Sequence, residues 1–294
     1  MQPPAFIARQ IMSYAHPESL VSTEWLAQRL TAPDIRIVDG TWFLPAQNRN
    51  ARREYEDAHI PGAVFFDIDD IADTASDLPH MLPSPEKFSS RVRKLGLGDG
   101  NRIIVYDGQG MMSAARVWWM FRVFGHEDVA ILDGGLPKWI AEGRPLEDRV
   151  PQPRERHFTA RINNFMVRDI GQVKDNLQAK REQVVDARTA GRFKGTDPEV
   201  WPGRRSGHIP GSYNLPFNEL LDPKAKTFLS ADQIAERFRR AGVDLTKPIV
   251  TSCGSGVTAA VLAFSLHLIG HNDVALYDGS WAEWGRPGDT PVET

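Results

Sequence analysis

The chain has 294 residues, of which 41% are hydrophobic and 25% charged, a composition typical of a globular protein with a sizeable core and not of a disordered chain. Its 35 basic and 38 acidic residues leave a net charge of −3, so no basic field for nucleic acid is present, and no run of about 20 apolar residues indicates a membrane span. The single cysteine excludes an internal disulfide and favours a reducing compartment, which we expect to be the cytoplasm.

The predicted elements alternate between short β-branched strands and helices. Residues 1–17 lack a long apolar segment, and we expect a poorly ordered extension there. The predicted strands are 35–38, 103–106, 184–185, 249–251 and 274–277. Helix signals include the capping box "SADQ" at Ser230 and the apolar run "AAVLAFSLHLIG", which begins at Ala259 and is closed by Gly270. This alternation predicts an α/β fold with a parallel sheet flanked by helices.

The chain repeats itself. "FGHEDVAILDGG" and "IGHNDVALYDGS" are related, and their histidines, His126 and His271, are separated by 271 − 126 = 145 positions. A second pair of motifs, "HIPG" at His59 and at His208, follows a predicted strand in each half. We therefore predict two copies of one domain, at 18–146 and 166–294, joined by the polar, proline-bearing linker 147–165.

The only cysteine lies in the stretch "IVTSCGSGVTAA", between a predicted strand and a predicted helix. Cys253 therefore falls at the carboxyl end of a parallel strand, where α/β sheets place ligands. Gly254 and Gly256 allow the backbone amides to turn toward one point, and these amides and the helix dipole favour the thiolate over the thiol. A buried, inert cysteine is the alternative, but a core position does not need two flanking glycines.

Several kinds of anion chemistry fit such a loop. A cysteine phosphatase or arsenate reductase needs an arginine where Ala259 stands, and a P-loop needs a lysine where Val257 stands. A cysteine protease needs a base elsewhere in the chain, which the sequence does not exclude. A metal site lacks further cysteine or histidine ligands nearby. The equivalent position in the first copy is Gly108, so only the second copy carries a nucleophile.

Taken together, the motifs resemble those of the rhodanese-type sulfurtransferases, and among these the two-domain 3-mercaptopyruvate sulfurtransferases. The resemblance covers nearly the whole chain and is carried by "CGSGVTAA", the paired "HIPG" motifs, "FFDID", "HMLP", "RVWWMF", "GRFKGTDPE" and "YDGSWAEW". It implies tandem rhodanese-like domains, no metal or organic cofactor, and a Cys253 persulfide that passes sulfur from 3-mercaptopyruvate to a small thiol, a thioredoxin-like protein or cyanide. Gly254 and Ser255 match the mercaptopyruvate type, whereas thiosulfate-preferring members carry cationic side chains at these two positions. The resemblance also implies that Gly254, Gly256, Val257 and Thr258 of the loop bind the donor.

The resemblance also implies individual roles. Ser255, supported by His80 and Asp69 of the first domain, would handle protons, and Arg192 would hold the substrate carboxylate with its planar guanidinium. By residue type alone, Ser255 could instead cap the following helix, His80 could be a loop histidine, and Asp69 could be one carboxylate of an acidic run. The family commonly has a second arginine nine residues after Arg192, but this chain has Trp201.

Two arginines follow that departure. Arg204 and Arg205 either supply the second carboxylate contact from a shifted backbone or are solvated loop charges.

Other prominent residues are better interpreted as structural. The two "HIPG" histidines recur in both copies, which favours a turn or packing role. The strand-ending Asp39 and Asp186 are expected to bind adjacent loops. Trp118 and Trp119 are expected to pack in the core or between the domains, with Arg116 as a salt-bridge partner.

Overall fold

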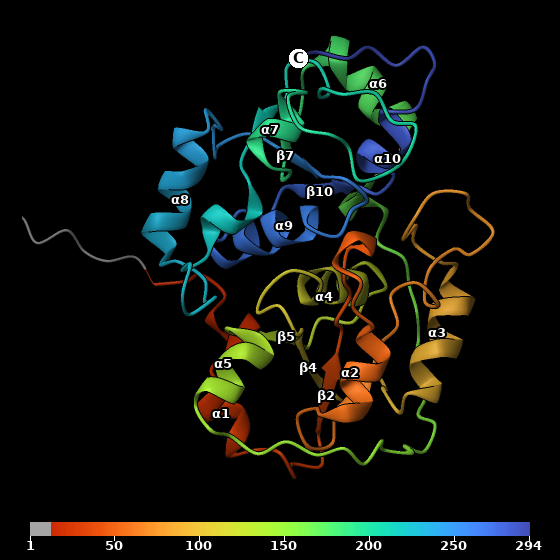
Figure 1. Ribbon diagram of the computed structural model, residues 1–294, viewed down its shortest axis with the longest axis vertical. Helices are drawn as coiled ribbons and strands as arrows, with labels where there is room; N and C mark the ends of the chain where they lie inside the picture. Colours follow the sequence, from red (N-terminus) through yellow and green to blue (C-terminus); the bar gives the residue numbers. More distant parts are fainter. Residues whose placement is uncertain (1–12) are drawn as a thin grey trace, which may run out of the picture.

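The computed structural model describes residues 13–294 and contains two α/β domains, one above the other in Figure 1. The N-terminal domain contains β1 (Leu20–Val21), α1 (Thr23–Ala27), β2 (Ile35–Asp39), α2 (Ala51–Asp57), β3 (Val64–Phe65), α3 (Pro85–Lys94), β4 (Arg102–Tyr106), α4 (Ala114–Val123), β5 (Val129–Leu132) and α5 (Gly135–Ala141). The C-terminal domain contains β6 (Val167–Arg168), α6 (Ile170–Ala179), β7 (Gln183–Asp186), α7 (Ala190–Phe193), β8 (Tyr213–Asn214), α8 (Ala231–Arg240), β9 (Ile249–Ser252), α9 (Ala259–Leu268), β10 (Val274–Tyr277) and α10 (Ser280–Trp284). Short 3-10 turns lie at Pro17–Ser19, Pro45–Gln47, Asn164–Met166 and Phe217–Leu220.

Each domain has one five-stranded sheet, and the two sheets have the same topology. Their strand orders are β1-β5-β4-β2-β3 and β6-β10-β9-β7-β8, so every strand has a counterpart in the other copy. All the strand pairs are parallel. The predicted fold class and the predicted duplication are therefore confirmed.

The local signals in the sequence account for the element ends. The predicted strand 274–277 is β10, and the predicted strand 249–251 lengthens by one residue into β9. Ser230 and Gln233 form the expected capping box at the start of α8, which then buries the apolar face that includes Ile234 and Phe238. Gly270 has the left-handed φ of +82° that lets the chain leave α9.

Helices α4 and α9 lie side by side where the two domains meet (Figure 1). Trp118 of α4 packs edge-on against Phe264 of α9, with ring centroids 4.8 Å apart. Trp118 and Trp119 are only 2% and 1% exposed, in keeping with the expected packing role. Because both helices are almost entirely apolar and buried, one continuous core joins the domains.

The "HIPG" histidines have matching packing roles. His59 Nδ1 lies 2.6 Å from Tyr55 O, and His208 Nδ1 lies 2.8 Å from Phe193 O. Each ring stacks on the aromatic side chain of the same residue, and each backbone forms a β-bridge with a glutamate far along the chain. These contacts agree with the structural interpretation of the repeated motif.

The linker and the start of the chain lie against the domains. Residues 147–163 follow the N-terminal domain without a helix or strand, and within them Phe158 is buried at 2% exposure. Of the expected extension 1–17, residues 1–12 lie outside the described residues. Tyr14 Oη donates to Leu229 O at 2.6 Å and Ala15 N donates to Leu268 O at 2.8 Å, so the described part contacts the C-terminal domain. Among residues 13–294, no helix is both long and apolar enough to cross a membrane.

Candidate active site

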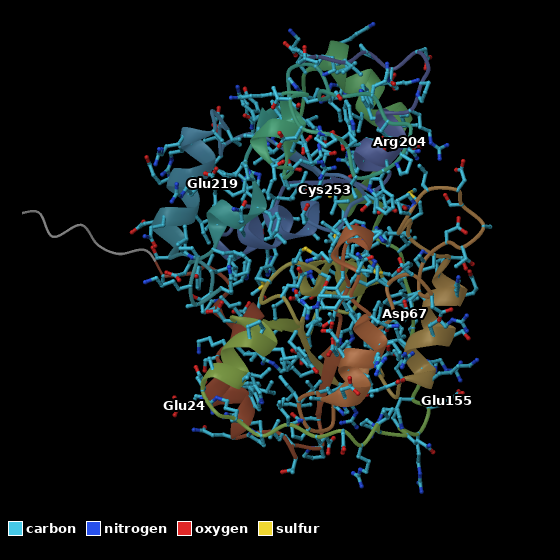
Figure 2. The ribbon with its side chains drawn as sticks, in the orientation of Figure 1. Glu24, Asp67, Glu155, Arg204, Glu219 and Cys253 are labelled. Carbon is cyan, nitrogen blue, oxygen red and sulfur yellow. The ribbon has the colours of Figure 1, made fainter. Side chains whose placement is uncertain are left out.

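Cys253 lies directly after β9, close to the middle of the molecule where the domains meet (Figure 2). The residue is 2% exposed. Its amide donates to Ser280 Oγ at 3.2 Å, and its carbonyl accepts a hydrogen bond from the Trp281 amide at 2.9 Å. Gly254 O accepts from the Ala282 amide at 2.7 Å. The start of α10 therefore holds both sides of the nucleophile in place.

The backbone amides that follow Cys253 are unpaired within the described chain. Within the described chain, none of the amides of residues 254–259 donates to a protein acceptor. Gly256 has a φ of +80°, and a Cβ there would lie 2.8 Å from Arg116 Nη1, so only glycine fits this turn. Unpaired amides next to a sulfur favour the charged forms of that sulfur, the thiolate and the persulfide anion.

The first copy shows how such a loop treats an anion. After β4, the carboxylate of Asp107 accepts four amide hydrogen bonds, from Gln109 at 2.8 Å, Gly110 at 2.8 Å, Met112 at 2.7 Å and Ala114 at 2.9 Å. The left-handed glycine is Gly110 in this loop and is one place later in the second loop. A strand, loop and helix of this kind can therefore direct four amides at a single negative charge.

Ser255, His80 and Asp69 form a hydrogen-bonded chain across the domain interface. His80 Nδ1 lies 3.0 Å from Ser255 Oγ, and His80 Nε2 lies 3.1 Å from Asp69 Oδ1. The Trp42 indole donates to Asp69 Oδ2 at 3.1 Å, and its ring meets the His80 ring edge-on. His80 has a left-handed φ of +61° and is 4% exposed, so its imidazole is fixed.

The charge state of this chain follows from its surroundings. Desolvation raises the pKa of Asp69, but the hydrogen bond and charge of His80 and the Trp42 donor outweigh it, and the net direction is downward. Asp69 is thus a carboxylate that orients the His80 ring, and the ring in turn faces the Ser255 hydroxyl. The arrangement can carry a proton to or from the neighbourhood of Cys253.

Arg192 of α7 lies against the nucleophile loop. A Cβ on Gly254 would be 3.1 Å from Arg192 Nη2. Glu199 takes one edge of this guanidinium, with Oε2 at 3.2 Å from Nε and 2.6 Å from Nη2. Nη1 makes no hydrogen bond to the described residues.

Comparison with known proteins identifies the family. A profile for the Rhodanese-like domain matches residues 22–142 and 169–286. The chain belongs to the rhodanese family. It is 45% identical over 284 residues to human 3-mercaptopyruvate sulfurtransferase, a match that covers 94% of this chain and 95% of the human protein.

Other rhodanese relatives are similar over the same span. A mouse thiosulfate sulfurtransferase is 43% identical over 283 residues, covering 94% of each chain. The crystal structure of SseA from Escherichia coli, described as a 3-mercaptopyruvate sulfotransferase, aligns with a TM-score of 0.83 at 41% identity, over 90% of this chain and 99% of that one. This rhodanese is therefore a two-domain sulfurtransferase.

One arginine of the rhodanese site was not predicted. Arg188 is 2% exposed and pairs with Asp186 and with Glu199, at 2.7 and 2.6 Å. Burial lowers the pKa of Arg188, but Asp186, Glu199 and Cys253 raise it, and the net direction is upward. The signal in the sequence was an arginine two places after a strand-ending aspartate, in "VVDAR".

Trp201 lies on the same side of the nucleophile loop as Arg192. Its Nε1 would be 3.5 Å from a Cβ on Gly254, and its ring meets the His80 ring at 5.8 Å between centroids. Its indole N–H has no hydrogen-bond acceptor among the described residues. Trp201 therefore offers a neutral donor beside the cation of Arg192.

The two arginines that follow differ in placement. Arg204 donates through Nε to Ala282 O at 2.8 Å and through Nη1 to Pro202 O at 2.9 Å, which leaves Nη2 unused. Burial, and next the charge of Arg286, lower the pKa of Arg204.

The expectation that Arg205 reaches the substrate is corrected. Its guanidinium donates to the carbonyls of Thr290 and Trp284, at 2.8 and 3.0 Å, and to Thr290 Oγ1. These bonds tie the C-terminal segment to the domain, and the Thr290 hydroxyl adds a further bond to Trp284 O at 2.7 Å. Val257 also enters the site only through its backbone, since its side chain lies in the core at 2% exposure.

Proposed function

We propose that this rhodanese transfers sulfur from 3-mercaptopyruvate to a thiol acceptor through a persulfide on Cys253, releasing pyruvate. The observation that carries the proposal is the hydrogen-bonded chain from Ser255 through His80 to Asp69. Ser255 is two residues after the nucleophile Cys253. Removing sulfur from carbon leaves a carbanion that must be protonated, and this donor class therefore needs a proton relay.

In the first half of the cycle the Cys253 thiolate attacks the donor sulfur. The new S–S bond forms as the C–S bond breaks, and the electron pair of the C–S bond leaves as the pyruvate enolate. The enolate carbon takes a proton from Ser255 Oγ, which His80 Nδ1 resupplies. The donor's own thiol proton, released to the relay as the outer sulfur of the persulfide ionises, balances the one gained by carbon, so no outside acid is consumed.

Donor binding is assigned to the residues around Gly254. The free Nη1 of Arg192 supplies a cation for the substrate carboxylate, and the unpaired indole N–H of Trp201 supplies a second, neutral donor. Glu199 holds the other edge of the Arg192 guanidinium, so the cation keeps one orientation. Arg204, with one unused Nη2, is proposed as an outer contact that attracts the anionic donor.

In the second half of the cycle the terminal sulfur of the persulfide moves to the acceptor. A small thiol or a thioredoxin-like protein attacks this sulfur, and Cys253 leaves as the thiolate that the loop amides stabilise. No resident metal or organic cofactor takes part in these steps. A reducing compartment such as the cytoplasm supplies the acceptor thiols and protects Cys253 from oxidation.

A thiosulfate:cyanide sulfurtransferase is the second candidate, favoured by the similarity to the mouse thiosulfate sulfurtransferase. Thiosulfate is a dianion whose leaving group, sulfite, needs no proton on carbon. The loop side chains next to Cys253 are uncharged, at Gly254 and Ser255, and a proton relay is present, and both observations favour the carbon donor.

The test compares the two donors. Pyruvate release from 3-mercaptopyruvate with a thiol acceptor is measured beside thiocyanate formation from thiosulfate and cyanide, for wild type and Cys253→Ser. We expect pyruvate release that disappears in the variant, a slower thiosulfate reaction, and one added sulfur on wild-type Cys253 by intact-mass spectrometry. A faster thiosulfate reaction would reverse the donor assignment. No added sulfur from either donor would refute sulfur transfer and leave a binding module.

A further inference from the structure

A buried ion pair joins the domains directly behind the proton relay. Arg116 of α4 is 0% exposed, and Asp278, the residue after β10, is 3% exposed. Arg116 Nη1 lies 2.7 Å from Asp278 Oδ1, and the Arg116 guanidinium also lies 4.5 Å from the Trp119 ring centroid. Arg116 Nη1 and Asp278 Oδ1 form an ion pair, but their geometry is not that of a hydrogen bond. Such a pair is costly to bury, so its position calls for a physical reason.

The pair binds the backbone directly after the His80 side chain. Arg116 Nη2 donates to His80 O, and Asp278 Oδ2 accepts from the Leu82 amide at 2.7 Å. The pair also meets the nucleophile loop, since a Cβ on Gly256 would lie 2.8 Å from Arg116 Nη1 and 3.1 Å from Asp278 O. Arg116 and Asp278 thus hold the backbone at His80 and Leu82 of the first domain against the Cys253 loop of the second domain.

The duplicated half provides an internal comparison. Asp133 occupies the place of Asp278, with 278 − 133 = 145, and its Oδ1 accepts from the Phe228 amide at 2.9 Å, just as Asp278 accepts from Leu82. Lys226 precedes Phe228 by two residues, as His80 precedes Leu82, and its φ is +58° against +61° for His80. The carboxylate-to-amide contact and the left-handed turn are therefore features of the duplicated fold and are found on both sides of the interface.

The arginine is found on one side alone. The position equivalent to Arg116 is Val261, with 261 − 116 = 145, and Asp133 has no arginine partner among residues 13–294. In keeping with this, burial raises the pKa of Asp133 to about 6, opposed by the Phe228 amide and the charge of Lys138. The cation is present in the half of the interface that faces Cys253, where the turn carries the histidine that contacts Ser255.

We propose that Arg116 and Asp278 are positioning residues that hold His80 in hydrogen-bonding reach of Ser255, and so set the rate of enolate protonation. This role rests on the proposed function. It differs from a role in joining the domains, because Asp133 makes the equivalent interdomain bond without contacting the site.

The experiment compares Asp278→Asn with the matched control Asp133→Asn. Both variants remove one interdomain carboxylate charge and keep an amide oxygen for the backbone N–H. The rate of single-turnover pyruvate release from 3-mercaptopyruvate depends on the proton relay. The rate of Cys253 alkylation by iodoacetamide depends on the nucleophile loop but not on the relay. We expect Asp278→Asn to slow pyruvate release about tenfold or more with KM and alkylation unchanged, since misplacing a catalytic group by about 1 Å has an effect of that order. Asp133→Asn should match wild type in all three.

A double-mutant cycle separates positioning from general damage. If Asp278 acts through His80, Asp278→Asn should add no loss to His80→Ala, whereas an independent structural effect would multiply with it. Should Asp278→Asn fail to fold, Arg116→Lys tests the same role, since a lysine can face Asp278 but cannot also reach His80 O, and the same slowing is expected.

The outcomes are distinct. Equal rates for Asp278→Asn and Asp133→Asn would overturn the positioning role and leave sulfur transfer standing. Slowed alkylation of Cys253 would overturn it too, by locating the effect in the nucleophile loop. Absence of pyruvate release by wild type would refute the proposed function itself, and this role with it.

Discussion

Replacing Asp107 by asparagine tests the physical basis of the nucleophile loop in the copy that has no nucleophile. Asp107 Oδ1 accepts from Gln109 and Gly110, and Oδ2 accepts from Met112 and Ala114. Asparagine keeps one oxygen and turns an NH2 group toward the other two amides. Two charge-assisted hydrogen bonds are lost at about 1.5–3 kcal/mol each, so the free energy of unfolding of the N-terminal domain should fall by about 3–6 kcal/mol.

The assay is urea unfolding followed by circular dichroism. Asp148→Asn serves as the control, because that side chain is exposed and lies outside both domain cores, and it should unfold as wild type does. The rate of Cys253 alkylation in native Asp107→Asn should stay unchanged, since the substitution lies in the other domain. A loss below about 1 kcal/mol would refute the claim that these loops gain their stability from a central anion.

Three further predictions address the site and the pH response. Trp201→Phe keeps the ring but removes the indole donor, and KM for 3-mercaptopyruvate should rise about tenfold with kcat little changed; an unchanged KM would remove Trp201 from the donor site. Gly256→Ala should lower the urea midpoint more than Gly62→Ala does. Both glycines have φ near +80°, but only a Cβ at Gly256 would clash with Arg116. Equal urea midpoints for the two variants would contradict this. Burial, then neighbouring cations, lower the pKa of His267 from 6.5 to about 3. As pH falls below about 6.5, His267 therefore takes up a proton in the unfolded chain but not in the folded one, and the free energy of unfolding should fall. The urea midpoint of His267→Gln should decrease less between about pH 7 and 4.5 than the midpoint of wild type does.

Much of the fold could be predicted from the sequence because its signals are local or periodic. β-branched runs fix the strands, and the capping box at Ser230 and the left-handed Gly270 fix helix ends within a few residues. The 145-residue repeat between His126 and His271 then supplies the architecture, since a strand order found in one copy holds for the other.

The site was less accessible, because its members are far apart in the sequence. His80 and Ser255 are separated by 175 positions, and no periodicity connects them, so the relay depended on resemblance to a known family. Arg188 was missed since a buried arginine looks like any loop charge until its carboxylate partners are placed. Arg205 was placed among the substrate contacts because the sequence does not reveal that the C-terminal segment packs against its guanidinium.

The asymmetry of the two copies explains how the site is divided. In the first copy, Asp107 neutralises the amides of its own loop, so that loop needs no bound anion and has become a stable support. Among the described residues of the second copy, the equivalent amides that follow Cys253 have no protein acceptor. His80 and Asp69 of the first copy reach Ser255 of the second across the domain interface, which Arg116 and Asp278 join on the same side. Neither domain alone holds both the nucleophile and the group that we propose completes its chemistry, and the interface between the domains is therefore part of the active site.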